Sequence, residues 1–149
     1  MLVRSDRGSA TIEFVAVGVL LLVPLVYVVI ALSRVQAAAF AADGSAREAA
    51  RAFVTAADEE DGRRRAAIAV RLGLLDQGFT DPDAGALAIE CQRADACLTP
   101  GSRVRIQVEV RVLLPGVPNF LDRALPAGTT VRSSQVAVVD RFRVQETEP

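Results

Sequence analysis

The chain has 149 residues, of which 51% are hydrophobic, and its 17 basic and 18 acidic residues give a formal net charge of −1. This near balance excludes a bulk electrostatic attraction to nucleic acid, so no nucleic-acid partner is expected. There is no histidine and there are only two cysteines. Because a zinc site takes four ligands, we expect no metal site, and we expect no cofactor.

A short polar segment ending in Gly8 comes first, and Ser9 and Glu13 follow it. Phe14 then opens an apolar run that contains no charged residue over residues 14–32. As a helix, this run would be roughly 28 Å long, about the thickness of the hydrocarbon core of a bilayer. Residues 14–32 are therefore expected to form a transmembrane segment.

Glu13 lies at the edge of the apolar run, where a carboxylate needs a compensating interaction. An ionised side chain deep in a bilayer costs on the order of 3 kcal/mol, and part of this cost remains at the edge. If the chain were cut after Gly8, Ser9 would carry a new ammonium group. Ser9 and Glu13 are four residues apart, so they share one face of a helix. The ammonium group and the helix dipole would then both favour the carboxylate.

The pattern of Gly8, Ser9 and Glu13 resembles the type IV prepilin signature, in which a polar leader ends in glycine and glutamate is the fifth mature residue. The resemblance implies that a prepilin peptidase cuts between Gly8 and Ser9 on the cytoplasmic side, which makes residues 1–8 a leader. It also implies that Glu13, with Phe14 beside it, pairs with the terminal amine of a neighbouring subunit and sets the register of helices in a filament.

Two other interpretations of this segment remain open. In the first, Glu13 is an incidental acid at the mouth of a plain signal anchor, and Gly8 is only a turn residue. In the second, the segment is a secretory signal that is cut near the alanines at 37–39. Such a signal normally has a shorter apolar core and no acid before that core. Retention of residues 1–8 in the mature protein would favour the anchor.

Residues 9–57 are expected to form one long helix. Apolar residues continue beyond the transmembrane run at three-to-four spacing, which indicates an amphipathic continuation. Pro24 removes one backbone hydrogen bond inside the apolar run, so a kink is expected there. Alternatively, the proline is simply tolerated in a membrane helix. The pair Asp43 and Gly44 could mark a bend between the membrane half and the soluble half.

Residues 58–149 are expected to form one extracytoplasmic α+β domain, in which a small antiparallel sheet packs against the long helix. The charged run over residues 58–65 is interpreted as a solvated turn, and residues 66–75 as a short helix. Strict alternation over residues 103–113 predicts a strand with apolar side chains on one face only. The other expected elements are strands over 87–92 and 129–144 and a helical turn over 119–125.

Cys91 and Cys97 form a close pair in sequence. In an exported domain, such a pair is most simply a disulfide that closes a small loop, and two reduced thiols are the alternative. Arg4 and Arg7 precede the apolar run, and short basic leaders usually stay in the cytoplasm. The domain over residues 58–149 is therefore expected outside the cytoplasmic membrane.

A leader, a long apolar helix and an added sheet domain together resemble a TadE-like minor pilin, also called a pseudopilin, of the tight-adherence (Tad or Flp) type IV pilus system. The resemblance implies a single-pass protein of the cytoplasmic membrane or of a surface pilus that takes part in pilus assembly, initiation or adhesion. The implied partners are the prepilin peptidase, other pilin and minor pilin subunits, the Tad inner-membrane assembly platform and the lipid bilayer.

Two other classes of function are alternatives to the pilin. An enzyme is disfavoured because the chain has no histidine, because its cysteines are expected to be bridged and because its carboxylates show no paired spacing. The stronger alternative is a signal-anchored, single-pass envelope protein whose sheet domain binds a partner while the helix only tethers it.

Overall fold

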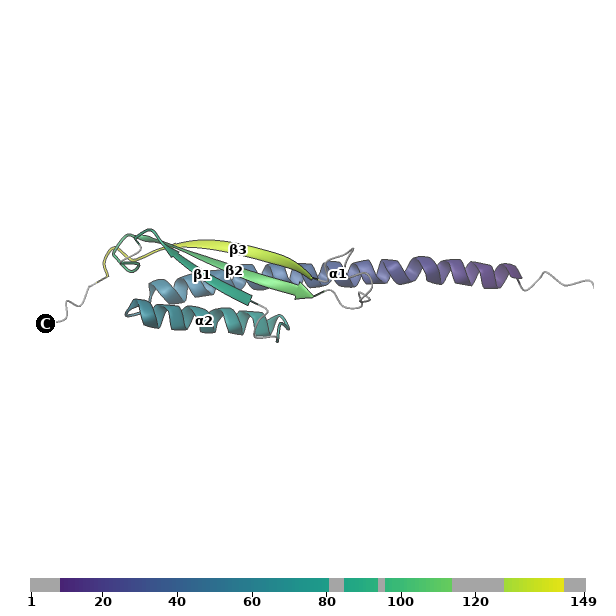
Figure 1. Ribbon diagram of the computed structural model, residues 1–149, viewed down its shortest axis with the longest axis horizontal. Coiled ribbons are helices and arrows are strands. Elements are labelled where there is room, and N and C mark those ends of the chain that lie inside the picture. Colours follow the sequence, from purple (N-terminus) through teal and green to yellow (C-terminus); the bar gives the residue numbers. More distant parts are fainter. Residues whose placement is uncertain (1–8, 81–84, 94–95, 114–127, 144–149) are drawn as a thin grey trace, which may run out of the picture. The chain divides into compact units, whose positions relative to one another are not determined.

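The computed structural model describes residues 9–80, 85–93, 96–113 and 128–143, with Ser9 described by its backbone alone. These residues form two helices and one antiparallel sheet of three strands, so the α+β class is confirmed (Figure 1). The chain divides into two compact units, Met1–Arg34 and Val35–Pro149. The elements in chain order are α1 (Ser9–Val54), α2 (Glu59–Asp76), β1 (Gly85–Cys91), β2 (Arg103–Leu113) and β3 (Gly128–Val138).

The sheet is centred on β2, which pairs antiparallel with β1 on one side and with β3 on the other. β2 has the bounds that alternation predicted, and its two faces differ completely in exposure. One face carries apolar side chains that are at most 1% exposed: Val104, Ile106, Val108, Val110 and Val112. The opposite face carries exposed arginines and the half-buried Gln107 and Glu109. The side chains alternate because one face of the sheet is covered by the core and the other is open to solvent.

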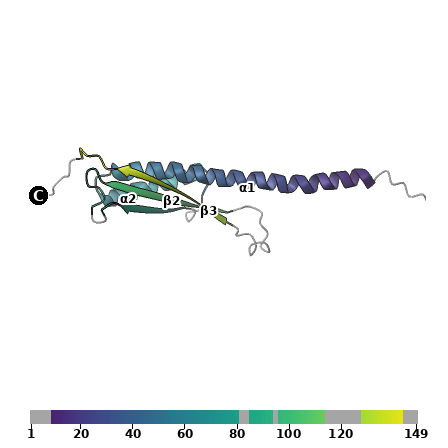
Figure 2. The ribbon, with the colours of Figure 1, turned by 90° about the horizontal axis from the view of Figure 1, so that it is seen from above.

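The buried face of the sheet packs against the α1 residues of the unit Val35–Pro149 and against α2, which lie on one side of it (Figure 1, Figure 2). These two helices are close together because small residues line their contact. A Cβ added to Gly73 of α2 would lie 2.3 Å from Oγ of Ser45 on α1, and one added to Gly62 would lie 3.0 Å from the Phe53 ring. Only glycine fits at these two positions without a shift of the neighbouring side chain.

Polar side chains form hydrogen bonds between α1 and β3, and between α1 and Arg143 at the end of the described chain. Asp43 accepts hydrogen bonds from Oγ of Ser133 at 3.3 Å and from Nε2 of Gln135 at 2.9 Å, both on β3. Arg143 donates to the backbone oxygen of Val54 at 3.3 Å. Because the last carbonyls of a helix lack partners within the helix, this guanidinium satisfies an otherwise orphaned group at the end of α1.

The prediction for residues 58–65 was wrong, because α2 already begins at Glu59. Asp58 is the N-cap of this helix, and its side chain accepts a hydrogen bond from the backbone N–H of Asp61 at 2.8 Å. Asp61 also pairs with Arg64 at 2.8 Å and with Arg65 at 2.6 Å. Acidic residues in a first helical turn and pairs at these spacings stabilise a helix, so the charge run starts α2 and is not a loop.

The other boundaries differ from the predictions by smaller amounts. α1 ends at Val54, three residues before the expected end, and it runs without a break through Asp43 and Gly44. β1 begins and ends slightly earlier than expected. β3 ends at Val138 because Asp140 accepts a hydrogen bond from the N–H of Phe142 at 2.9 Å and turns the chain. The helical turn expected over 119–125 lies outside the described residues.

The contact between α1 and α2 can be tested with two glycines. Gly73→Ala should lower the free energy of unfolding of the unit Val35–Pro149 by about 1 kcal/mol, because the overlap of its methyl group with the Ser45 side chain outweighs the gain in helix propensity. Gly44→Ala is the matched control, because an added Cβ there meets nothing within 4 Å. It should raise stability by up to about 1 kcal/mol through helix propensity alone. Urea unfolding followed by circular dichroism measures the free energy of unfolding of both variants. Equal changes in the two variants would contradict the close packing of Gly73 against Ser45.

Candidate functional site

The segment of α1 within the unit Met1–Arg34 carries an apolar surface that the described residues leave uncovered. Phe14 is 79% exposed, Leu20 is 72% exposed and Leu22 is 57% exposed. Among the described residues, α1 is the one helix that is long and apolar enough to cross a membrane, and its most apolar stretch has no buried side chains. A signal sequence has these properties too. A buried core helix does not, because its apolar side chains would be covered.

Glu13 is exposed and is the only charged residue between Ala10 and Leu32. It lies in α1, which begins at Ser9, where the described part of the chain also begins. No ion pair involves Glu13 among the described residues. Gly8 lies outside them, so the expected cleavage site between Gly8 and Ser9 stays a prediction.

Pro24 lies inside α1, and the helix continues on both sides of it. A backbone proline within a helix removes one hydrogen bond, and in a membrane that loss has to be compensated locally. Gly18 faces open space, since an added Cβ would meet nothing within 4 Å. The kink expected at Pro24 therefore remains a prediction, and Gly18 is available for a contact from outside the chain.

Cys91 and Cys97 lie at disulfide distance and are paired, with their Cα atoms 5.1 Å apart. The Cys97 side of the loop is held by two hydrogen bonds. Its N–H donates to Oε1 of Glu59 at 2.7 Å, and its carbonyl oxygen accepts from Oγ of Ser102 at 2.8 Å. Glu59 is in the first turn of α2, so the disulfide loop connects the end of β1 to the start of α2.

The open face of the sheet is rich in arginine. Arg132 of β3 donates to Glu109 of β2 at 2.6 Å, and this hydrogen bond and the charge of Glu109 raise the pKa of the Arg132 guanidinium. The group therefore remains a cation throughout the physiological pH range. Arg103, Arg105 and Arg111 of β2 make no ion pair with other described residues. The pair itself is exposed and contributes little to stability.

The predicted site residues fall into two groups that belong to different compact units. Glu13, Phe14 and Pro24 lie in the unit Met1–Arg34, whereas Cys91 and Cys97 lie in the unit Val35–Pro149. Sequence reasoning missed the polar contacts that organise the second unit, including the bond from Cys97 to Glu59. The capping signal of Asp58, with acids in the three positions after it, could have placed Glu59 on a helix; its distant partner could not have been foreseen.

Comparisons with protein-family models, with curated proteins and with solved structures give no match for this chain. A proposal of function therefore rests on the residues and on the geometry described above.

The disulfide loop provides a direct test of what holds β1 to α2. Replacement of both Cys91 and Cys97 by serine should lower the free energy of unfolding by roughly 2–3 kcal/mol, because a short closed loop is released in the unfolded chain. Glu59→Gln is the control, because it keeps an acceptor for the Cys97 N–H and should cost less than about 1 kcal/mol. Both changes are measured by urea unfolding. If Glu59→Gln lowered the free energy of unfolding more than the double serine variant did, the stabilising role of the disulfide would be contradicted.

Proposed function

We propose that this chain is a TadE-like minor pilin, or pseudopilin, of a tight-adherence type IV pilus. A prepilin peptidase would cut it between Gly8 and Ser9, and α1 would hold it in the cytoplasmic membrane with the unit Val35–Pro149 outside. The observation that carries the proposal is the uncovered apolar surface of α1 with one acid, Glu13, near its start. The proposal assigns no chemical reaction to the chain.

The mechanism follows from the cost of placing Glu13 next to hydrocarbon. A carboxylate there is expensive unless a cation neutralises it, and no described residue does so. Cleavage before Ser9 would create an ammonium group at the right distance along the helix. In a filament, the amine of one subunit could neutralise Glu13 of its neighbour, and this pairing would be specific for one register of the packed helices.

The apolar helix would then exchange one environment for another. In the membrane, its side chains contact lipid, whereas in a filament they would contact the helices of other subunits. Apart from the carbonyl that Pro24 leaves unpaired, neither change exposes backbone groups within the apolar run, because a helix satisfies its own N–H and C=O groups. The inner-membrane assembly platform would supply the work of extraction, and the second unit would contact other minor subunits or the cell exterior.

The second candidate function is a signal-anchored envelope protein with an extracytoplasmic binding domain. The same helix supports it, because a plain anchor also has an uncovered apolar surface. A secretory signal cut after the alanines at 37–39 is less compatible with the fold. Ala38 is 0% exposed within the core, so this cut would remove a core side chain from the mature domain.

The N-terminus of the membrane-extracted protein separates these candidates. Terminal peptide analysis and intact mass, in cells with and without their prepilin peptidase, should show a peptidase-dependent start at Ser9. The variant Gly8→Leu should block the cut, because the motif ends in glycine. An intact Met1 in both strains, or a start near Ala39, would overturn the pilin proposal and leave the anchored or secreted alternative.

Glu13 provides the second test. Glu13→Val should leave cleavage at Ser9 and the stability of the second unit unchanged, because the substitution lies outside that unit. It should lower the amount of the protein recovered in sheared pili by on the order of tenfold, if an interaction of about 1.4 kcal/mol is lost. Phe14→Leu keeps the charge and is the matched control. Equal recovery of the wild type and Glu13→Val would contradict the register role.

A further inference from the structure

β1 is an edge strand whose backbone is open on one side among the described residues. The N–H of Gln92 donates to the carbonyl of Arg103 at 3.0 Å, which makes these two residues a hydrogen-bonded pair. In an antiparallel ladder, such pairs alternate with pairs that make no mutual hydrogen bonds. The backbone groups of Gly85, Leu87 and Ile89 therefore point away from β2, and no other described residue bonds to them.

The hydrophobic core is also incompletely covered along this edge. Leu87 and Ile89 face the core, yet both remain partly exposed. Their neighbours across the ladder, Val108 and Ile106 of β2, are 0% exposed. The same apolar layer is thus closed at the centre of the sheet and open at β1. One further strand beside β1 would close it, because neighbouring strands lie about 4.8 Å apart.

A groove between β1 and α2 continues this open layer and has a volume of about 500 Å³. Its lining is mostly apolar, with one charged side chain, Arg71. Leu74 packs directly on the backbone of Gly85, where an added Cβ would lie 2.4 Å from Cδ1 of Leu74, and this contact forms the floor of the groove. The remaining lining residues are Ala67, Val70, Leu75, Phe79, Thr80 and Leu87.

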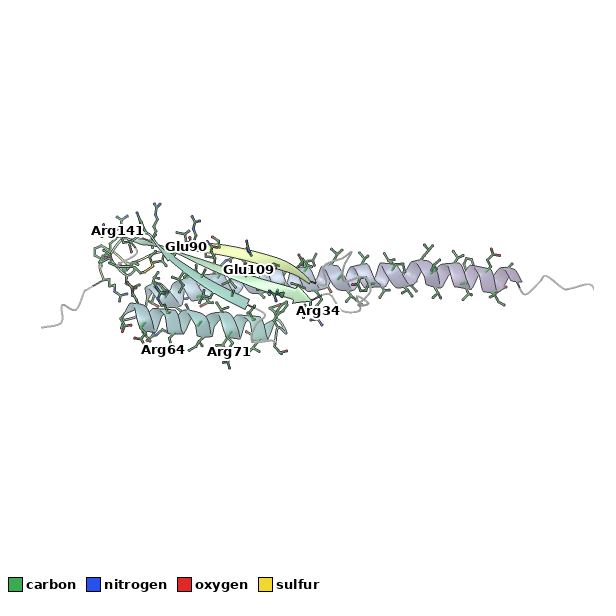
Figure 3. All side chains as sticks on the ribbon, viewed as in Figure 1. Arg34, Arg64, Arg71, Glu90, Glu109 and Arg141 are labelled. Atoms are coloured by element: carbon green, nitrogen blue, oxygen red, sulfur yellow. A yellow bond between two sulfur atoms is a disulfide. The ribbon has the colours of Figure 1, made fainter. Side chains whose placement is uncertain are left out.

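Among the described residues that line the groove, Arg71 is the one that carries a charge. Arg64 and Arg71 both lie on α2 (Figure 3), and Arg71 also lines the groove. Arg64 pairs with Asp61, whereas Arg71 makes no ion pair among the described residues. The apolar residues Ile68 and Leu72 lie close to Arg71 in the sequence of α2 and are 57% and 56% exposed. An occupant of the groove would therefore gain from carrying a carboxylate opposite Arg71.

We propose that the groove and the free edge of β1 bind an extended, acidic segment of another protein, which adds a strand to the sheet. Its backbone would pair with Gly85, Leu87 and Ile89, alternate apolar side chains would enter the groove, and an Asp or Glu would meet Arg71. Strand addition of this kind takes affinity from main-chain hydrogen bonds and specificity from side-chain pockets. The inference uses only the unit Val35–Pro149 and does not depend on the pilin proposal.

Other occupants fit the observations less well. A second copy could offer β1 or β3, but β3 contains no acid. The one acid of β1, Glu90, lies on the open face of the sheet, where it accepts a hydrogen bond from Nε2 of Gln107 at 3.0 Å, so neither strand brings a counter-charge to Arg71. The hydrocarbon of a bilayer has no hydrogen-bonding groups, so it could not satisfy the open backbone groups of β1. An extended acidic segment satisfies the backbone, the groove and the charge together.

The experiment places a photoreactive amino acid at Leu75, which lines the groove and is 41% exposed, in the full-length protein in its own cells. Cross-linked peptides are then sequenced. The expected product joins Leu75 to a segment of a different protein that contains Asp or Glu. Arg71→Glu should lower its yield roughly fivefold, because an exposed charge pair is turned into a repulsion. Arg111→Glu, on the open face of β2, should not lower it.

A second variant tests the backbone pairing. Leu87→Pro removes an N–H that points away from β2 and leaves the β1–β2 hydrogen bonds in place, because proline is tolerated at such edge positions. It should abolish the cross-link while the disulfide between Cys91 and Cys97 still forms. Replacing the partner's acid by arginine should restore the cross-link to the Arg71→Glu protein. Cross-links to a second copy or to lipid, no cross-link, or equal effects of the two arginine changes would overturn the proposal.

Discussion

The close approach of α1 and α2 is the constraint on which the rest of the second unit depends. A Cβ added at Gly73 would overlap the Ser45 side chain, and one added at Gly62 would be in tight contact with the Phe53 ring. Because the two helices are held together in this way, they present one layer to the sheet. The buried face of β2 can then be built from branched side chains such as Ile106, while α1 contributes mainly alanine. Packing at native density requires this division between large and small residues.

Polar contacts fix the arrangement that the packing allows. Asp43 accepts hydrogen bonds from two residues of β3, and Glu59 accepts one from the disulfide loop. Each joins a helix to a segment far away in the sequence, so each restricts the direction of the sheet over the helices. Apolar packing is not directional. Hydrogen bonds from fixed backbone and amide donors are directional. They therefore select one placement of the sheet over the helices among several that would bury a similar area.

The long helix and the sheet could be predicted from local sequence patterns. The long-range contacts between them could not. The alternation of β2 gave its exact bounds, because a strand that is buried on one face must alternate. The start of α2 was missed because a charge run also fits a loop, although the Asp58 cap was a visible signal. The roles of Asp43 and Glu59 depend on partners more than thirty residues away. For the candidate site, the sequence indicated Glu13 and the apolar run but gave no sign of the groove beside β1.

Two apolar surfaces remain uncovered among the described residues, and their backbones determine which partners they can take. Between Ala10 and Leu32, α1 satisfies its own hydrogen bonds except the one that Pro24 removes, and it carries one charge, so hydrocarbon or other apolar helices can surround it. The edge of β1 has backbone groups without partners, and in hydrocarbon each of these would cost several kcal/mol. It therefore has to face water or another strand. The first surface is suited to a membrane or a helix bundle, and the second is suited to water or to an added strand.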